Sequence, residues 1–364
     1  MGFLSPMTKR LFSEEHRAGS SVIRATHAYI YLRWIKEYVY VARNYLIPFL
    51  PRPIKTWLQN NYHSKVLTQR EAEDIVRFEG RIDLHEISDQ IIPYPTIRDM
   101  VLLEHSVIGV LNCACRDAVE AEGGIPCEPR QVCMIMGEPF VSFAIEKHRT
   151  VKMSPEDIKA TLESEGMVDL GGVLVMTPEH AVGFLLEQHK LGRVHTAWFK
   201  DATMGRFYAL CNCCSCCCSG VKAMFKWDTD IVAASGYVTI IDPEPCDGCG
   251  ICVDICIYDA LEIGPDGKAA HVLDAHGHET CMGCGLCETH CPLDCMHLEL
   301  PTDPKVLPFE VRLIEAAHHV DLGGESDEEV ILDVFSKMGV RAEDASDFRK
   351  RYGLSPRPGT PPRT

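Results

Sequence analysis

Two runs of cysteines, each with the spacing Cys-x2-Cys-x2-Cys-x3-Cys, constrain this chain more than any other feature of its 364 residues. The segments Cys-Asp-Gly-Cys-Gly-Ile-Cys and Cys-Met-Gly-Cys-Gly-Leu-Cys agree at every cysteine and glycine, so the two runs are an internal duplication. The first run is Cys246, Cys249, Cys252 and Cys256, and the second is Cys281, Cys284, Cys287 and Cys291.

The spacing within each run suits a cubic [4Fe–4S] cluster. Three thiolates on one tight loop hold three irons, and the fourth cysteine of each run ligates the other cluster. Glycines between the cysteines let backbone amides approach the sulfides and donate hydrogen bonds. Structural zinc is the alternative, but it takes two Cys-x2-Cys pairs and not two runs of four. We therefore expect one cluster on Cys246, Cys249, Cys252 and Cys291, and a second on Cys281, Cys284, Cys287 and Cys256.

On these motifs, residues 237–300 resemble the two-cluster bacterial ferredoxins. The resemblance implies that this module moves electrons. The sequence differs from these ferredoxins in two places, and neither difference removes a predicted cluster ligand. Ile257 replaces the proline that usually follows the fourth cysteine, and the connection over residues 257–280 is longer and carries three histidines. Cys295 is surplus to the motif, and we expect it to be a buried thiol.

Ten further cysteines lie upstream of the module, in two groups. Six cysteines in eight residues cannot all be inert buried thiols, and they cannot pair locally as disulfides without strain. Because thiolates are soft ligands, we predict one or two further iron–sulfur clusters here. The alternatives are zinc, a redox-active thiol store and, for the first group, buried structural cysteines. The first group is Cys113, Cys115, Cys127 and Cys133, and the second is Cys211, Cys213, Cys214, Cys216, Cys217 and Cys218.

Two other side chains lie beside these cysteines in the sequence. Arg116 follows Cys115 and would stabilise an anionic cluster. His195 precedes the dense run and would ligate iron or donate a proton there, although a single histidine is more often a core or surface residue. The sequence contains no Gly-x-Gly-x-x-Gly loop, Walker loop or Gly-x-Ser-x-Gly elbow, so we expect neither flavin nor nicotinamide.

The order of the motifs also carries a resemblance. The segments Cys-x-Cys-Arg, Cys-Met-x-Met-Gly and Cys-Asn-Cys-Cys-x-Cys-Cys-Cys precede the paired ferredoxin runs. Over about residues 90–300, this arrangement resembles a family of uncharacterised anaerobic 4Fe–4S dicluster proteins. The resemblance implies electron transfer and gives no substrate.

Charge and the first residues restrict partners and location. The formal net charge of −16 argues against nucleic-acid binding and favours docking on basic patches of a redox partner. The N-terminal Met-Gly-Phe-Leu-Ser-Pro shows neither the basic and apolar regions of a signal peptide nor a twin arginine. We therefore expect a cytoplasmic protein, with peripheral contact at the cytoplasmic membrane face as an alternative.

One long helix is predicted over residues 21–47, followed by Pro48, Pro51 and Pro53. Its charged residues leave no uncharged run of the ~18–20 residues that span a bilayer. The mixture of aromatic, basic and aliphatic side chains suits contact with a membrane surface or partner, or packing on the protein's own core.

Capping patterns predict further elements. Thr68 and Glu71 form a capping box. Ser-Pro and Thr-Pro pairs at residues 154–155 and 177–178 place a hydroxyl cap before a proline at the first helical position. The remaining predicted segments are a strand over residues 171–176 and helices over 96–104 and 327–338.

These signals together predict an α+β fold. A helical N-terminal and central body rich in cysteine carries an inserted-style module with two [4Fe–4S] clusters, and short C-terminal helices follow. The predicted domains are an amphipathic helical segment (1–60), a mainly helical cysteine-rich domain (61–236), the dicluster domain (237–302) and a helical extension with a proline-rich tail (303–364).

Three functions fit the sequence. The first is an iron–sulfur electron-transfer protein or subunit, not itself an enzyme, that passes single electrons between a donor and a partner oxidoreductase. The second is a reductase in which a cluster with an open iron near Cys211–Cys218 reduces a small molecule. The third, a metal-sensing or zinc-binding interaction protein, would depend on the upstream cysteines alone.

Overall fold

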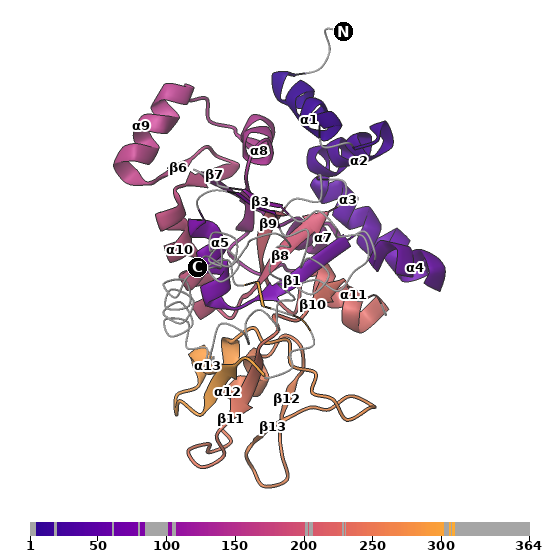
Figure 1. The fold of residues 1–364 in the computed structure, drawn as a ribbon, viewed down its shortest axis with the longest axis vertical. Coiled ribbons are helices and arrows are strands. Elements are labelled where there is room, and N and C mark those ends of the chain that lie inside the picture. Colours follow the sequence, from indigo (N-terminus) through magenta and orange to yellow (C-terminus); the bar gives the residue numbers. More distant parts are fainter. Residues whose placement is uncertain are drawn as a thin grey trace, which may run out of the picture.

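In the computed structural model, the N-terminal helices, a central sheet with its helices and the cysteine-rich module follow one another along the longest axis (Figure 1). The structure describes residues 5–17, 20–59, 62–78, 81–83, 101–103, 107–200, 207–227 and 231–301, together with residues 203, 229, 306, 308 and 309.

The N-terminal part is a series of short helices. The prediction of one helix over residues 21–47 is wrong at Trp34, whose φ of −131° and ψ of 45° are not helical. The Trp34 ring packs edge-on against Tyr29 at 5.9 Å and lies 5.4 Å from the Arg33 guanidinium, and these contacts stabilise the break. The elements are α1 (Pro6–Arg17), α2 (Val22–Arg33), α3 (Ile35–Val41), the π-helix η1 (Ala42–Leu46), the 3-10 helix η2 (Ile47–Phe49) and α4 (Arg52–Gln59).

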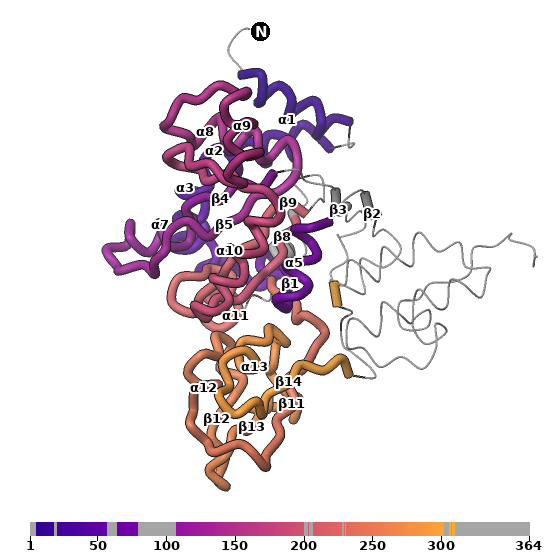
Figure 2. Tube along the Cα trace, turned by 90° about the vertical axis from the view of Figure 1, so that its left-hand side faces the viewer, coloured from indigo at the N-terminus to yellow at the C-terminus, as the bar shows by residue number. Residues whose placement is uncertain are grey.

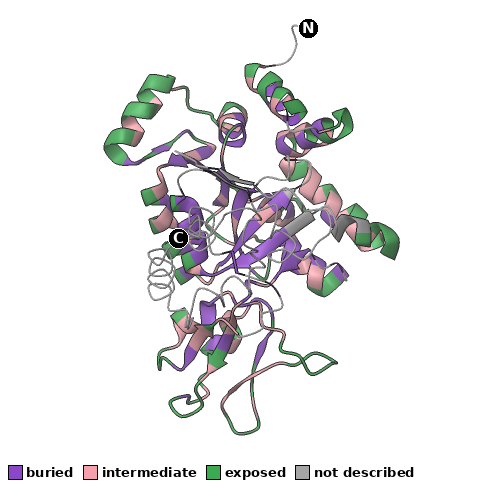
Figure 3. Ribbon diagram, viewed as in Figure 1, coloured by how far each residue is buried: buried purple, intermediate pink, exposed green. Residues whose placement is uncertain are grey.

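An eight-stranded sheet forms the centre of the molecule, with the strand order β10-β1-β8-β9-β5-β4-β7-β6. All neighbours are antiparallel except β1 and β10. Strands β4 and β9 bury nearly every residue, so both faces of the sheet are covered (Figure 3). The strands are β1 (Tyr62–Leu67), β4 (Ile108–Asn112), β5 (Gln131–Met136), β6 (Met167–Asp169), β7 (Val173–Met176), β8 (Val194–Lys200), β9 (Phe207–Cys213) and β10 (Val232–Ala233).

The eight-stranded sheet lies within the region predicted as a mainly helical domain, residues 61–236, where the sequence predicted a single strand. A short apolar run such as Ile108–Asn112 fits a buried strand or a buried helix equally well, because periodicity does not separate the two. The α+β class is confirmed, and the predicted strand over residues 171–176 is β7. Within the predicted helix over 96–104, β3 (Val101–Leu103) pairs with β2 (Arg81–Asp83). The rest of that segment and residues 327–338 lie outside the described residues.

Three helices beside the sheet begin where the capping patterns predicted them, after Thr68, Ser154 and Thr177, but the Thr177 side chain makes no capping bond. Thr68 Oγ1 accepts a bond from Glu71 N at 3.2 Å, and Glu71 Oε2 accepts one from Thr68 N at 2.7 Å, so the capping box is confirmed. Ser154 caps α9, which ends at the left-handed Gly166. The helices are α5 (Gln69–Arg77), α7 (Ala114–Ala121), α8 (Phe140–His148), α9 (Pro155–Glu165), α10 (Pro178–Lys190) and α11 (Ser219–Trp227).

The duplication in the sequence recurs in the backbone of the module. Gly250 and Gly285 have left-handed backbone, with φ of 80° and 79°, and each precedes a short helix that packs against the other. Each half therefore places its cysteines on an equivalent loop. The elements are β11 (Val238–Ile241) paired with β14 (Met296–Glu299), β12 (Leu261–Ile263) paired with β13 (Ala269–His271), and the helices α12 (Ile251–Ile255) and α13 (Leu286–His290).

The module lies below the body in Figure 2, and α13 of the module contacts α10 of the body. His189 Nε2 lies 2.8 Å from Thr289 Oγ1, and His290 Nε2 lies 3.1 Å from Lys190 O. These polar contacts fix the module at the end of the body that carries the upstream cysteines.

Candidate metal centres

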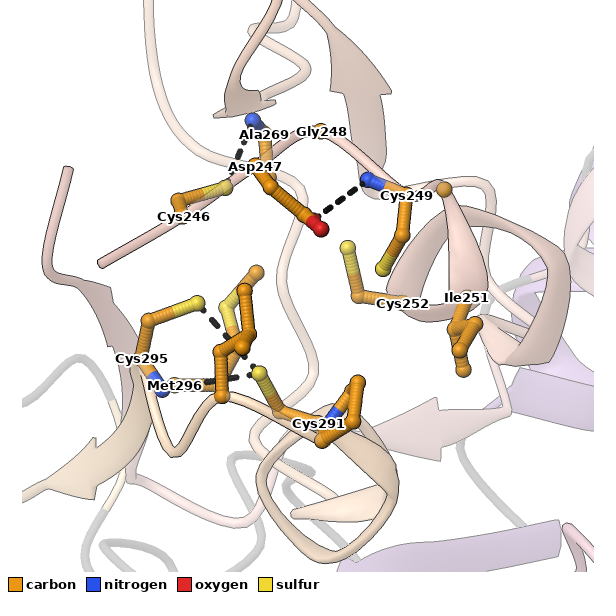
Figure 4. Close-up of a pocket in the computed structure, with 13 residues that line it drawn as sticks. Cys246, Asp247, Gly248, Cys249, Ile251, Cys252, Ala269, Cys291, Cys295 and Met296 are labelled. Carbon is orange, nitrogen blue, oxygen red and sulfur yellow. Dashed lines mark hydrogen bonds between the residues drawn. The ribbon is translucent and has the colours of Figure 1, made fainter. Parts of the chain in front are cut away.

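The cysteines predicted to hold the first cluster surround one cavity (Figure 4). Three of them come from the loop before α12 and its first turn, and the fourth comes from the end of α13. The fourth ligand thus belongs to the other run, as the crossed pattern requires. Cys295 also lines the cavity, with its Sγ 3.3 Å from Cys291 Sγ. The predicted ligands around the cavity are Cys246, Cys249, Cys252 and Cys291.

Backbone amides point at the thiols of the module. Ala269 N donates to Cys246 Sγ at 3.5 Å, and Ala260 N donates to Cys256 Sγ at 3.4 Å. Such N–H···S bonds stabilise negative charge on a cluster ligand and tune its reduction potential. A thiol-lined cavity with amide donors therefore fits a [4Fe–4S] cluster.

The other four cysteines of the module lie near one another. The pKa of Cys287 is raised to about 11, first by burial and then by the charges of Cys281 and Cys256. Burial also raises the pKa of Cys284, and the charges of its three companions act in the same direction. A buried thiol of this kind becomes a thiolate when it binds a cation, so the second set also fits metal ligation.

The ten upstream cysteines form two groups in space that differ from their two groups in the sequence. Strands β5 and β9 are neighbours, and Cys133 lies opposite Cys211, so the two sequence segments meet. We call one group the thiol quartet, because its four Sγ atoms lie within 4.8 Å of one another. The remaining six cysteines are the thiol sextet. The quartet is Cys127, Cys214, Cys216 and Cys217, and the sextet is Cys113, Cys115, Cys133, Cys211, Cys213 and Cys218.

The sulfur atoms of the sextet follow one another in a chain of contacts. Cys133 Sγ lies 3.8 Å from Cys211 Sγ, and Cys213 Sγ lies 3.3 Å from Cys218 Sγ. Cys211 and Cys213 are two residues apart on β9 and share one face of the sheet. The Cys115 thiol interacts with Cys218, which joins α7 to this row. Both sequence segments therefore contribute to one thiol-rich site.

Arg116 is fully buried between the two groups. Its Nη1 donates to Pro129 O, whereas Nε and Nη2 have no hydrogen-bond partner among the described residues. Burial lowers the pKa of Arg116, but the charges of Cys214 and Cys113 outweigh burial and hold the pKa above its usual value. The position fits the role suggested by the sequence, since a buried cation offsets the charge of neighbouring thiolates.

His195 lies on the opposite face of the sheet from the cysteines. It pairs with Asn212, the residue between Cys211 and Cys213 on β9, and side chains alternate along a strand. Its Nδ1 lies 2.7 Å from Asn212 Oδ1, and its Nε2 lies 2.7 Å from Gln69 Oε1. Both ring nitrogens are therefore engaged, and the role of iron ligand does not fit this position.

Tyr258 belongs to the module and lies where the module meets the thiol sextet. Its hydroxyl is buried and has no hydrogen-bond partner within the described part of the chain. Burial raises the pKa of Tyr258 well above its ordinary value, and the charges of Cys284, Cys213 and Cys218 act in the same direction. One apolar cluster contains Tyr258 and Ile257 together with thiols of both sites, so the module and the sextet share a core.

The fold and the site define an iron–sulfur protein with a ferredoxin-type domain. Residues 245–295 match the family model of the 4Fe-4S dicluster domain. Over 147 residues the chain is 28% identical to the indolepyruvate oxidoreductase subunit IorA of Thermococcus kodakarensis, a similarity that covers 40% of this chain and 20% of that relative. No solved structure matches the chain. The resemblance to the anaerobic dicluster family stays a prediction.

Two residues near the metal sites were not predicted from the sequence. Tyr258 is one, because its position between two cysteine sites depends on how the module docks. Arg43 is the other. Its Nη1 donates to Cys217 O at 2.8 Å, and its Nε lies 2.8 Å from Glu122 Oε1. The only sequence signal for Arg43 was a basic residue within a tyrosine-rich helix. Its partners Cys217 and Glu122 are distant in the chain, so the sequence does not indicate them.

Proposed function

We propose that this chain is an iron–sulfur electron-transfer subunit that relays single electrons between a donor and a partner oxidoreductase. The observation that supports the proposal most is the shared apolar cluster in which Tyr258 packs with thiols of the module and of the sextet. When bound, [4Fe–4S] clusters accept and release one electron at a time. The similarity to an oxidoreductase subunit agrees with this role.

In this proposal, the chain's own residues hold three iron–sulfur centres. Backbone amides donate to the thiolates of the module, and Arg116 offsets the negative charge of the upstream thiolates. The acidic surface favours docking on basic patches of a partner. The first centre would use Cys246, Cys249, Cys252 and Cys291, the second Cys281, Cys284, Cys287 and Cys256, and the third the thiol sextet.

The sextet favours a relay over the reductase alternative. One cube has four irons, and six thiols are enough to give every iron a thiolate. An open iron, which a small-molecule reductase would use, needs a thiolate-poor site. The density of cysteines therefore supports electron transfer to a partner that carries the substrate chemistry.

We further propose that the N-terminal helices make peripheral contact with the cytoplasmic face of a membrane. Val22, Ile23 and Phe49 are 80%, 83% and 77% exposed, and Arg24 lies beside the first two. Exposed aliphatic and aromatic residues with basic neighbours suit an interfacial helix. No helix of the described chain is long and apolar enough to span the bilayer. Flotation with anionic vesicles tests this, and equal flotation of wild type and Ile23→Asp would contradict it.

The central proposal is tested by metal analysis without oxygen. Purified full-length protein should contain acid-labile sulfide and about twelve irons per chain in iron–sulfur centres, about eight of them in the module. EPR spectra during a redox titration should resolve the reduced centres. Protein without sulfide would refute the proposal, and about eight irons would confine it to the module.

A further inference from the structure

The thiol quartet differs in geometry from every other cysteine site in the described chain. Cys216 Sγ lies 2.6 Å from Cys127 Sγ, 3.4 Å from Cys217 Sγ and 3.7 Å from Cys214 Sγ. All four sulfurs lie within 4.8 Å of one another, and no other group of three or more ligating side chains in the described residues converges in this way. The eight predicted ligands of the module all lie within the described residues, and they form no group of this kind.

Spacing separates a single ion from a cube. Four thiolates around one tetrahedral ion at about 2.3 Å lie about 3.8 Å from one another. Thiolates of a [4Fe–4S] cluster sit on different irons at the corners of a cube, which puts them roughly 6 Å apart. The quartet is closer to the first arrangement.

We propose that the quartet binds one zinc ion through four thiolates, as a structural site separate from the iron–sulfur centres. The inference goes beyond the proposed electron transfer and does not depend on it. A site with four protein ligands is closed to substrate, as in structural zinc sites. Four thiolates also prefer zinc to ferrous iron, since zinc follows iron in the order of divalent-metal affinities.

The charges around the quartet fit such an anionic centre. Zinc with four thiolates carries a net charge of −2, because each thiolate contributes one negative charge. Arg116 is buried beside Cys214 with its Nε and Nη2 unbonded in the described structure. Arg193 lies near Cys127, with its Nη2 donating to Glu128 O at 3.1 Å. Two cations therefore flank the site.

Contacts from other parts of the chain hold the two segments that carry the ligands of the quartet. Cys127 belongs to the loop between α7 and β5, and the other three thiols belong to the turn between β9 and α11. Cys127 N donates to Cys217 Sγ at 3.4 Å. Arg43, 4% exposed, joins the carbonyl of Cys217 to the carboxylate of Glu122 at the start of the loop. Such outer contacts orient metal ligands.

The site is accessible from one side. Cys214 and Cys217 are buried, whereas Cys216 is exposed. A metal ion can therefore reach the site from the side where Cys216 is exposed, and the two buried thiols then enclose it. The zinc would tie the α7–β5 loop to the turn after β9, the strand that carries Cys211 and Cys213 of the sextet.

The test measures zinc, iron and sulfide on one anaerobic preparation of the full chain. Wild type should contain about one zinc per chain, and zinc-edge X-ray absorption should show four sulfur ligands at about 2.3 Å. Cys127→Ser and Cys216→Ser should lose zinc and keep iron and sulfide. Cys213→Ser, from the sextet, is the matched control and should lose iron and keep zinc. If Cys127→Ser does not fold, the exposed Cys216→Ser gives the same readout.

Three results would overturn the inference. One is a Cys216→Ser protein that loses about four irons with their sulfide, which would make the quartet a cluster site. Another is zinc that stays unchanged in both quartet variants. The last is a metal-free wild type whose Cys127 and Cys216 are found as a disulfide after anaerobic alkylation. A protein that contains zinc but no acid-labile sulfide would refute the iron–sulfur proposal and leave the zinc inference standing.

Discussion

The Sγ atoms of Cys213 and Cys218 lie 3.3 Å apart, one at the end of β9 and the other directly before α11. Cys218 also interacts with Cys115, so the pair lies at the centre of the thiol sextet. We predict that Cys218→Ser removes about four irons and their sulfide per chain and leaves the EPR signals of the module in place. Loss of the module's signals, or an unchanged iron content, would contradict the assignment.

Cys291 and Cys295 test the ligand set of the first cavity. Both thiols line it and lie 3.3 Å apart, yet the spacing of the run assigns ligation to Cys291 alone. Cys291→Ser should disturb one of the module's two EPR-active centres, whereas Cys295→Ser should leave both. If Cys295→Ser disturbs a centre and Cys291→Ser does not, the fourth ligand of the first cluster is Cys295 and not Cys291. Cys249→Ser should reproduce the Cys291→Ser result.

The sequence locates the ferredoxin-type module, but it does not show how the upstream cysteines are grouped in space, for a physical reason. The ligands of the module lie within a few residues of one another, so their spacing encodes the loop that holds the cluster. The division into quartet and sextet depends on the pairing of Cys133 with Cys211 across β5 and β9, which no local pattern encodes. The face occupied by His195 follows from the register of β8 on β9, which is equally nonlocal.

The prediction of helices was also limited to features that neighbouring residues encode. Caps are local, so the box at Thr68 and the start at Ser154 could be predicted from neighbouring residues. The break at Trp34 depends on tertiary ring contacts, and the eight-stranded sheet depends on strands far apart in the chain. Local pattern therefore predicted element ends better than element type.

Gly248 and Gly250 form a matched pair for testing the first cluster loop. Both have positive φ, 72° and 80°. A Cβ at Gly248 would lie 1.9 Å from Gly267 O, whereas a Cβ at Gly250 would meet nothing within 4 Å. Both alanine variants lose about 1–2 kcal/mol to left-handed strain. Gly248→Ala should lose more and release the first cluster, which thermal unfolding and EPR of the two variants would measure. Equal melting temperatures would count against the backbone clash.

Tyr258→Phe tests the connection between the module and the sextet. The buried hydroxyl has no partner among the described atoms and lies among thiols of both sites. An O–H dipole directed at a cluster favours the added electron, so its removal should make a reduction potential more negative. A hydrogen bond to a charged group that contributes about 1.5 kcal/mol corresponds to a shift of about 65 mV for one electron. Redox titration followed by EPR would measure the shift, and unchanged potentials would exclude the contact.

His195 should make the fold sensitive to acid. Burial lowers its pKa to about 3, and the charge of His189, whose ring stacks at 5.4 Å, acts in the same direction. The ordinary pKa is about 6.5, so below that pH the unfolded chain binds a proton that the folded chain does not. The free energy of unfolding should therefore fall as pH decreases below about 6.5, by at most about 1.4 kcal/mol per pH unit. Anaerobic thermal unfolding between about pH 8 and 5.5 should give a shallower slope for His195→Gln. Parallel slopes for the variant and wild type would show that His195 is protonated in the folded protein, and its buried position between Asn212 and Gln69 would then have to stabilise a cation.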